Sequence, residues 1–450
     1  MTSQASLRAA IRAHATHQPN AAGWTLLPAV DDVLPAPRSG HSVVEYQGRL
    51  YVFGGYDSLT SKSECFDTLW EFDVASARWA RINKKGLWPR PRCGHAAIVA
   101  RDSMFILGGT GADFGKCTFG DMWRFDFALR EFIPVAPLRA DAVDSEVSFG
   151  APSQQQPGLH PPAMYGQAMV HAGSHVLVFG GTDGHAYSND LFALNLDSLV
   201  WTRLMCSGDA PSQRYMAACF LCAGATAAAT AAATAAATAA ATAAATAAGQ
   251  RLLVIGGGKH MPSGQEPIDV YALDLATLAW SKLPLPNDES TPRLLLGSAV
   301  LRLAPLSDDF MLFGGRSHNI CVPASPSSTR QSSSTWLFSL ARGRWTRCVG
   351  DCDDDVRGRD YLQGAVVGDR AFLFGGFDGA CRLNHVLTRR LSFTPASLEM
   401  IALQQLCRAL HCDDGDAEAG ASGLPETVRA AIEATACIAA RPAVTTAIES

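Results

Sequence analysis

Five arginines stand at or just before the start of short apolar runs and could hold acidic groups. A guanidinium group can donate two parallel hydrogen bonds to one carboxylate. The carboxylates could belong to a bound molecule or to aspartates of the chain itself. The five arginines are Arg38, Arg92, Arg214, Arg293 and Arg359. The candidate intramolecular partners are Asp67, Asp121, Asp190, Asp269 and Asp360.

Histidines offer too few ligands for a metal ring. His41 and His95 follow the first two arginines. The corresponding later positions are predicted to be Gln167, Ala217, Leu296 and Leu362. Since none of these later residues is a metal ligand, both histidines are predicted to be polar structural residues.

Two further groups of potential ligands have spacings that fit no standard zinc pattern. Cys348 and Cys352 lie beside Asp351 and the acidic run 353–355, which we interpret as a solvated connection. The second group consists of Cys407, His411 and Cys412. The sequence therefore predicts no metal and no other cofactor.

Six Gly-Gly pairs, each at the end of an apolar run, mark the elements that must position the arginines. They are Gly54-Gly55, Gly108-Gly109, Gly180-Gly181, Gly256-Gly257, Gly314-Gly315 and Gly375-Gly376. Their first glycines lie 54, 72, 76, 58 and 61 residues apart. The 76-residue gap contains a 24-residue Ala/Thr tract, without which it is 52 residues long. A period of roughly 50 residues is typical of the blades of a β-propeller.

The first repeat shows the predicted unit of four strands. Its strands are predicted at 42–46, 50–53, 69–73 and 79–82, with turn residues between them. Trp79 in the fourth strand is matched by aromatic residues in later repeats, which are Phe132, Trp201, Trp280 and Trp345. We expect these aromatic rings to pack between neighbouring blades.

The two ends of the repeat region predict how the ring closes. The sixth repeat has a third strand near 386–393 but no aromatic fourth strand. An additional fourth strand, Trp24 to Leu27, lies before the first repeat. We predict that this N-terminal strand completes the last blade, which gives six blades and removes exposed sheet edges.

These motifs resemble the Kelch superfamily over residues 24–395. The resemblance depends on the segments 38–42 and 92–96, the glycine pairs and the spaced tryptophans. The chain looks most like the Kelch propellers of BTB-adaptor and muskelin-like proteins, although no BTB segment is recognisable. The resemblance implies an all-β fold and a role in protein interaction. Strand geometry predicts that the five arginines lie near the mouth of the central channel, and the resemblance implies that they help bind acidic peptide motifs of a protein partner.

Enzymes with Kelch-like propellers provide the alternative interpretation. Copper oxidases of this kind use a Tyr/His radical site, which spacing alone does not test. Iron-dependent specifiers use Glu, Asp and His at steps of four, but no glutamate here has an aspartate four residues later. A small-molecule or sugar-modifying enzyme that uses the central channel therefore stays as the runner-up to a binding scaffold.

Composition restricts the cellular setting. The formal net charge is −5, and no basic stripe predicts nucleic-acid binding. The 13 cysteines are scattered and odd in number, which favours reduced thiols in a cytoplasmic protein. The Ala/Thr tract at 225–248 interrupts a predicted hairpin, and Ala and Thr are only marginally apolar. We therefore interpret it as a low-complexity insert and not as a membrane span.

The sequence predicts three segments. Residues 1–23 form a flexible N-terminal arm, in which Arg8 and Arg12 leave a mitochondrial presequence open. Residues 24–395 form the propeller. Residues 396–450 form a helical C-terminal extension, which either packs as a tail or serves a partner or a second copy of the chain. Long loops on one face of the propeller are predicted to carry the binding function.

Overall fold

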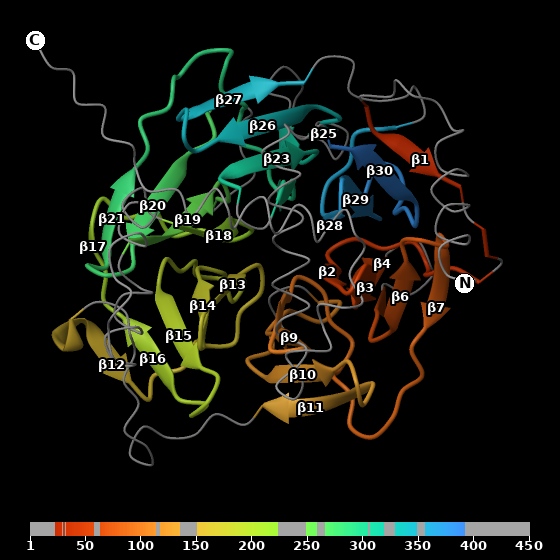
Figure 1. Ribbon diagram of the computed structural model, residues 1–450, viewed down its shortest axis with the longest axis horizontal. Coiled ribbons are helices and arrows are strands. Elements are labelled where there is room, and N and C mark those ends of the chain that lie inside the picture. The colour runs from red at the N-terminus through yellow and green to blue at the C-terminus, as the bar shows by residue number, and fades with distance from the viewer. Residues whose placement is uncertain are drawn as a thin grey trace, which may run out of the picture. The chain divides into compact units, whose positions relative to one another are not determined.

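The computed structural model describes residues 23–28, 30–31, 33–57, 64–113, 118–135, 151–223, 249–258, 266–304, 307–318, 329–348 and 356–391. These residues form an all-β propeller of six blades, as the sequence predicts (Figure 1). Residues 1–22, the Ala/Thr tract and the predicted C-terminal helices lie outside the described residues. None of the described residues forms a helix long and apolar enough to cross a membrane.

Each blade contains four antiparallel strands, which in blades 1 to 5 follow one another in sequence order from the channel outward, whereas in blade 6 the N-terminal strand of the propeller is the outermost. Blade 1 contains β2 (Ser42–Tyr46), β3 (Arg49–Phe53), β6 (Leu69–Asp73) and β7 (Arg78–Arg81). Blade 2 contains β8 (Ala96–Ala100), β9 (Ser103–Leu107), β10 (Met122–Asp126) and β11 (Glu131–Val135). Blade 3 contains β13 (Ala168–Ala172), β14 (His175–Phe179), β15 (Leu191–Asn195) and β16 (Trp201–Leu204).

The other three blades repeat this order. Blade 4 contains β18 (Ala218–Ala223), β19 (Gln250–Ile255), β20 (Val270–Asp274) and β21 (Ala279–Lys282). Blade 5 contains β22 (Ala299–Arg302), β23 (Asp309–Phe313), β26 (Thr335–Ser339) and β27 (Arg344–Arg347). Blade 6 contains β28 (Gln363–Val367), β29 (Arg370–Phe374), β30 (Val386–Arg390) and β1 (Thr25–Leu27).

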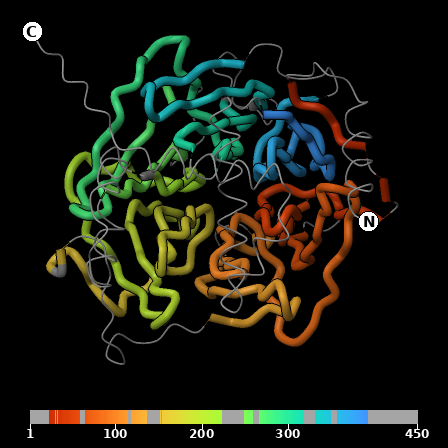
Figure 2. The backbone as a smooth tube through the Cα atoms, in the orientation of Figure 1, coloured from red at the N-terminus to blue at the C-terminus, as the bar shows by residue number. Residues whose placement is uncertain are grey.

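The N-terminal strand closes the ring, as predicted. Strand β1 pairs antiparallel with β30, with Thr25 opposite Thr388 and Leu27 opposite Val386. Figure 2 shows the red N-terminal segment beside the blue end of the propeller. Trp24, which is fully buried, donates a hydrogen bond of 3.1 Å from Nε1 to Thr335 Oγ1 of blade 5. The closing strand therefore fixes the last blade to its neighbour as well as to its own sheet.

Aromatic pairs hold neighbouring blades together, which confirms the expectation from the sequence. In four blades the ring of the aromatic residue in or beside the fourth strand lies against the phenylalanine that ends the second strand of the preceding blade. The pairs are Trp24–Phe313, Trp79–Phe374, Phe132–Phe53 and Trp280–Phe179, with centroids 5.2, 5.0, 5.2 and 5.6 Å apart. Trp201 and Trp345 instead share hydrophobic clusters with Leu107 and Ile255, the last residues of the corresponding second strands.

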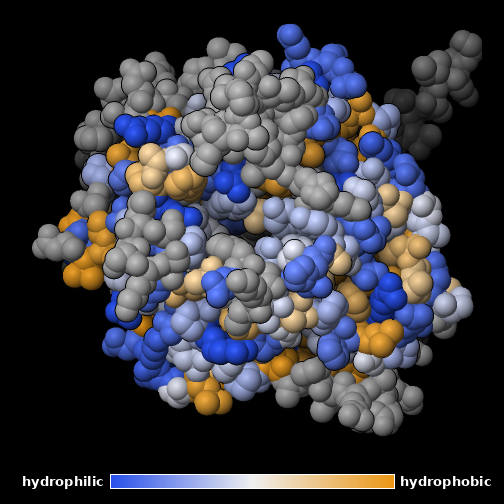
Figure 3. All heavy atoms as spheres, turned by 180° about the vertical axis from the view of Figure 1, so that it is seen from behind, coloured by the Kyte–Doolittle hydropathy of each residue, from blue (hydrophilic) through white to orange (hydrophobic). Residues whose placement is uncertain are grey.

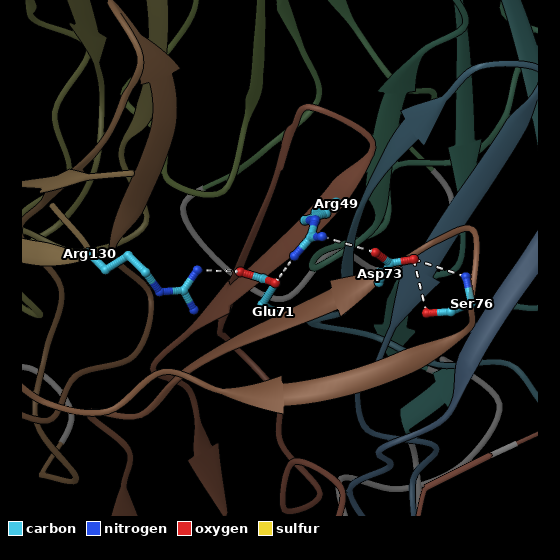
Figure 4. Close-up of polar contacts among 5 residues, drawn as sticks. All are labelled: Arg49, Glu71, Asp73, Ser76 and Arg130. Atoms are coloured by element: carbon cyan, nitrogen blue, oxygen red, sulfur yellow. Dashed lines mark hydrogen bonds and ion pairs between the residues drawn. The ribbon is translucent and has the colours of Figure 1, made fainter. Parts of the chain in front are cut away.

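A charged network also joins blades 1 and 2 (Figure 4). The carboxylate of Glu71 on β6 is largely buried and accepts hydrogen bonds from Arg49 of its own blade and Arg130 of blade 2. The Arg130 contact is 3.0 Å long. Arg49 also contacts Asp73, which caps the following turn by accepting a hydrogen bond from the amide of Ser76. Blade contacts are therefore both apolar and ionic.

Additional short strands elaborate the propeller. Two short hairpins each follow a glycine pair, on the face that the sequence predicts to carry the long loops (the loop-rich face). One pairs β4 (Tyr56–Asp57) with β5 (Glu64–Cys65), and the other pairs β24 (Arg316–His318) with β25 (Thr329–Gln331). A 3-10 turn (Pro152–Gln154) leads into β12 (Gln155–Pro157), which adds a fifth strand to blade 3. Strand β17 (Ser207–Gly208) does the same in blade 4, where it runs parallel to β21.

Candidate interaction site at the channel mouth

Six residues just before the innermost strands form a ring around the channel. They are Gly40, Gly94, Gly166, Met216, Gly297 and Tyr361, all with φ between +51° and +71°. Backbone hydrogen bonds of 2.7–2.9 Å join them from blade to blade, with Gly94 donating to Gly40, Gly166 to Gly94, Met216 to Gly166, Tyr361 to Gly297 and Gly40 to Tyr361. Glycine is favoured here because the left-handed conformation costs other residues about 1–2 kcal/mol. This ring fixes where the neighbouring side chains lie.

Four of the five predicted arginines lie two residues before this ring and are buried. Arg38, Arg92, Arg214 and Arg359 are at most 2% exposed. In each, Nε donates to the carbonyl two residues earlier, and Nη1 donates to the carbonyl of the first glycine of its blade's glycine pair. Each arginine therefore joins the entrance of the first strand to the end of the second strand.

Two of these arginines form ion pairs with aspartates named from the sequence. Arg92 donates to both carboxylate oxygens of Asp121, at 2.8 and 2.9 Å. Arg214 donates to both oxygens of Asp269, at 2.7 and 3.0 Å. Arg38 instead donates to Thr68 Oγ1 at 3.2 Å, and burial lowers its pKa to about 9. These contacts support pairing within a blade, the alternative that the sequence left open, and direct binding of a partner by the arginines stays a prediction.

The assignment of Arg293 to this set is corrected by the structure. Blade 5 has two additional residues between Pro292 and ring residue Gly297, compared with Pro37 and Gly40 of blade 1. As a result Leu295 lies two residues before the ring and packs beside Gly315, as Arg38 packs beside Gly55. Arg293 forms its backbone bridge with Pro267 instead.

The two histidines are buried structural residues. His41 is 2% exposed and His95 is 7% exposed. Nε2 of His95 lies 2.9 Å from Ser42 Oγ, and burial lowers the pKa of His95 to about 3. Burial also lowers the pKa of His41. Both imidazoles are therefore neutral at physiological pH.

The described residues do not form a ring of metal ligands next to the ring residues. The insertion in blade 5 gives Ser298, and not Leu296, the position next to the ring that His41 has in blade 1. Over the described ranges, no three His, Cys, Asp or Glu side chains gather as metal ligands would.

The residue directly before each ring residue is expected to point away from the side chain at the arginine position, because side chains alternate along an extended chain. In blades 3 and 4 this residue is a tyrosine. Tyr165 and Tyr215 pack edge to face with centroids 6.3 Å apart, and Tyr187 lies 5.5 Å from Tyr215. All three rings are only partly buried. Burial raises the pKa of Tyr165 and Tyr215, so their hydroxyl groups stay protonated and able to donate.

An arginine and a buried carboxylate continue this cluster into blades 5 and 6. Arg316 on β24 donates from Nη2 to the Tyr361 hydroxyl at 2.6 Å and lies over the ring of Tyr361, 4.7 Å from its centroid. Its Nε is 3.2 Å from Oδ2 of Asp360, whose side chain is fully buried. Burial raises the pKa of Asp360 to about 6, although Arg316 opposes the shift.

A second arginine lies at the mouth between blades 6 and 1. Nε of Arg382 donates to Ser39 Oγ at 3.0 Å. The guanidinium group lies over the rings of Tyr56 and Phe377, 4.6 and 5.2 Å from their centroids. Arg382 and Arg316 are both only partly buried, so two cations and several tyrosines surround the mouth.

Comparison with known proteins identifies the family. The model of the KLHDC2/KLHL20/DRC7 Kelch-repeats domain matches residues 15–140 and 242–403, and the Kelch motif matches residues 163–206. The chain belongs to the Kelch-repeat family. Kelch propellers are typically protein-interaction domains.

Among its Kelch relatives, rat and human Kelch domain-containing protein 10 are both 26% identical over 357 residues. That alignment covers 74% of this chain, 72% of the rat protein and 67% of the human protein. The leucine-zipper-like transcriptional regulator 1 homolog of Drosophila melanogaster is 27% identical over 192 residues, which is 42% of this chain and 18% of that protein. None of these names states an enzymatic activity.

Sequence reasoning singled out arginines at the strand ends, four of which are buried, whereas the partly exposed residues lie near them. The partly exposed cluster consists of Tyr165, Tyr187, Tyr215, Arg316, Tyr361 and Arg382. One signal could have found part of it. Side chains alternate along an extended chain, so the residue after a buried arginine must face the other way.

Proposed function

We propose that this Kelch propeller is a protein-interaction scaffold that binds its partner through the loop-rich face and the channel mouth. The observation that carries the proposal is the cluster of four tyrosines with Arg316 and Arg382 at the mouth. Tyrosine and arginine dominate the binding energy of many protein interfaces, because each combines a large apolar area with hydrogen-bond donors. The buried arginines enter this proposal as the supports of that surface.

The charge of the cluster favours an acidic segment in the partner. Arg316 and Arg382 bring two positive charges, which face one buried carboxylate at Asp360. A carboxylate of the partner could accept charge-assisted hydrogen bonds from either arginine. On the face seen in Figure 3, the coloured apolar residues lie in small separate groups and not in one continuous patch, which gives an apolar partner surface less support there.

Affinity capture with matched charge variants tests this proposal. Wild-type protein, Arg316→Glu and Arg251→Glu are used as bait, and captured proteins are identified by mass spectrometry. Arg251 is exposed and lies near the start of β19, at the opposite end of that strand from Gly256-Gly257. We expect a partner that is retained by wild type and Arg251→Glu but lost by Arg316→Glu. A partner retained equally by all three folded baits would contradict the proposed site.

Asp360 is the observation that favours the runner-up, a small-molecule or sugar-modifying enzyme. A buried carboxyl group with a pKa of about 6 beside tyrosine hydroxyls could serve as a general acid or base. A metabolite screen by thermal shift, followed by product analysis, tests this function. A compound that is converted by wild type and not by Asp360→Asn would support it, whereas binding without conversion by either protein would support the scaffold.

A further inference from the structure

Two buried thiols meet at the contact between blades 1 and 2. Cys65 lies on β5, in the loop-rich hairpin of blade 1, and Cys93 lies directly before ring residue Gly94 of blade 2. Their Sγ atoms are 3.6 Å apart, within hydrogen-bond distance of each other. Both sulfurs also lie near the carbonyl oxygen of Thr110, at 3.9 and 3.7 Å. The two residues are 28 positions apart in the chain, so the fold alone brings them together.

The environment of the two thiols separates their roles. A hydrogen bond accepted from the Cys93 thiol lowers the pKa of Cys65, despite its burial and the nearby Glu64. The shared hydrogen bond and burial raise the pKa of Cys93, against the effect of Arg382. Cys65 is also the more exposed of the two, at 7% against 1%. Cys65 is therefore the better nucleophile, since the thiolate is the reactive form.

Other described cysteines lack this arrangement. Burial raises the pKa of Cys206, Cys219 and Cys222 to about 12 in each case. Cys381 has a raised pKa as well, because of burial and the adjacent Asp378. These four thiols therefore provide internal controls for reactivity within the same molecule.

We propose that Cys65 and Cys93 form a redox-active dithiol, which a peroxide oxidises to a disulfide that links the loop-rich face of blade 1 to the channel mouth in blade 2. This proposal does not depend on the proposed function. The sulfur atoms would move from 3.6 Å apart to a bond of about 2.05 Å. Such a movement draws β5 toward the residue that precedes Gly94, and so alters the surface at the mouth.

The oxidation balances with hydrogen peroxide as the named oxidant. The Cys65 thiolate attacks one peroxide oxygen, the O–O bond breaks, and the products are the Cys65 sulfenic acid and, after protonation, one water molecule. The Cys93 sulfur then attacks the Cys65 sulfur, and the S–O bond breaks. Hydroxide leaves and takes up the Cys93 proton as a second water molecule. Two thiols are oxidised to one disulfide, and one peroxide is reduced to two waters.

Peptide mapping of the full chain tests the proposal. The folded protein is treated with a small excess of hydrogen peroxide, remaining thiols are blocked, and peptides are analysed by mass spectrometry without reduction. We expect the Cys65–Cys93 linked peptide as the main disulfide, and we expect dithiothreitol to remove it. A disulfide between other cysteines, or oxidation of Cys206 and Cys219 before this pair, would overturn the proposal.

Two single variants test the assigned roles. In Cys93→Ser, the Cys65 sulfenic acid has no second thiol to react with, so dimedone labelling of Cys65 should rise at least several-fold. In Cys65→Ser, Cys93 should show no such increase. Cys219→Ser is the matched control and should form the Cys65–Cys93 disulfide as wild type does. Equal dimedone labelling of Cys93 in Cys65→Ser would refute the order of attack, and the wild-type map remains decisive if a variant does not fold.

Discussion

Truncation of Arg92 should destabilise the propeller strongly, because this buried arginine has a structural role. Its side chain is fully buried and donates to both oxygens of Asp121 and to the carbonyls of Gly108 and Arg90. In Arg92→Ala, the buried Gly108 carbonyl loses this donor and Asp121 loses its counter-ion. Breaking a buried ion pair costs about 3–5 kcal/mol. Because the Asp121 side chain is 34% exposed and water can solvate it, we expect the lower end, about 3 kcal/mol.

Urea unfolding, followed by circular dichroism, measures this loss of free energy. A double-mutant cycle with Arg92→Ala and Asp121→Ala should give a coupling energy of about 1–3 kcal/mol. Arg78→Ala is the matched control, since the Arg78 side chain is 63% exposed and pairs with Asp31 at 3.0 Å. An exposed pair of this kind contributes less than about 1 kcal/mol.

The pH dependence of the coupling gives a second, independent reading. Burial alone would raise the pKa of Asp121, but the hydrogen bonds and positive charge of Arg92, together with a hydrogen bond from Trp123 and the charge of Arg90, outweigh it and lower the folded-state pKa. A carboxyl group of this kind stabilises the fold above its unfolded pKa of about 3.9, and the stabilisation is lost as pH falls through the folded value. The coupling energy should therefore be full at neutral pH and shrink below about pH 4.

The reasoning is refuted if Arg92→Ala costs no more than Arg78→Ala at neutral pH. In that case the arginine would not stabilise its blade, and direct contact with a partner would become the better account of its role. Arg38 offers a natural comparison, because its guanidinium has the same backbone partners but donates to Thr68 in place of an aspartate.

Three further predictions concern the ring, the contact between blades, and the mouth. Gly166→Ala should be less stable than Gly173→Ala in thermal unfolding. Both glycines have positive φ, but only at Gly166 would the added Cβ lie 2.9 Å from a tyrosine ring, that of Tyr215. Equal losses of stability would show that the Tyr215 side chain moves aside at little cost. Glu71→Ala should cost about 1–3 kcal/mol in urea unfolding, because this carboxylate is 7% exposed and pairs with two arginines. Asp197→Ala should cost less than about 1 kcal/mol, because the Asp197 side chain is 66% exposed. A smaller loss for Glu71→Ala than for Asp197→Ala would contradict the bridging role of Glu71. The pKa of Asp360 is raised to about 6, so the folded chain holds this proton more tightly than the unfolded chain does. Stability should therefore fall as pH rises from about 4 to 6 and then level off. Asp360→Asn should flatten this pH dependence of the melting temperature, and an unchanged slope would show that another group causes it.

The architecture could be predicted because its signals are local. Each blade repeats a strand that ends in Gly-Gly and an aromatic residue in the fourth strand, and these positions depend on the chain within one repeat. The closing strand at Trp24 followed from counting strands, since an incomplete last blade needs a partner. The prediction that the fourth-strand aromatic residues pack between blades needed only the assumption that large rings at equivalent positions are buried.

The sequence alone determined that this is a six-bladed Kelch propeller with an elaborated face, and only the tertiary structure decided which side chains that face presents. Arg92 and its equivalents are buried, whereas Tyr165 and Tyr215, directly before the ring in blades 3 and 4, are partly exposed. The two additional residues in blade 5 moved Arg293 out of register. The contacts of Arg316 with Asp360, and of Cys65 with Cys93, join different blades. No local pattern specifies such contacts, because they depend on how separately folded sheets are oriented around a common axis.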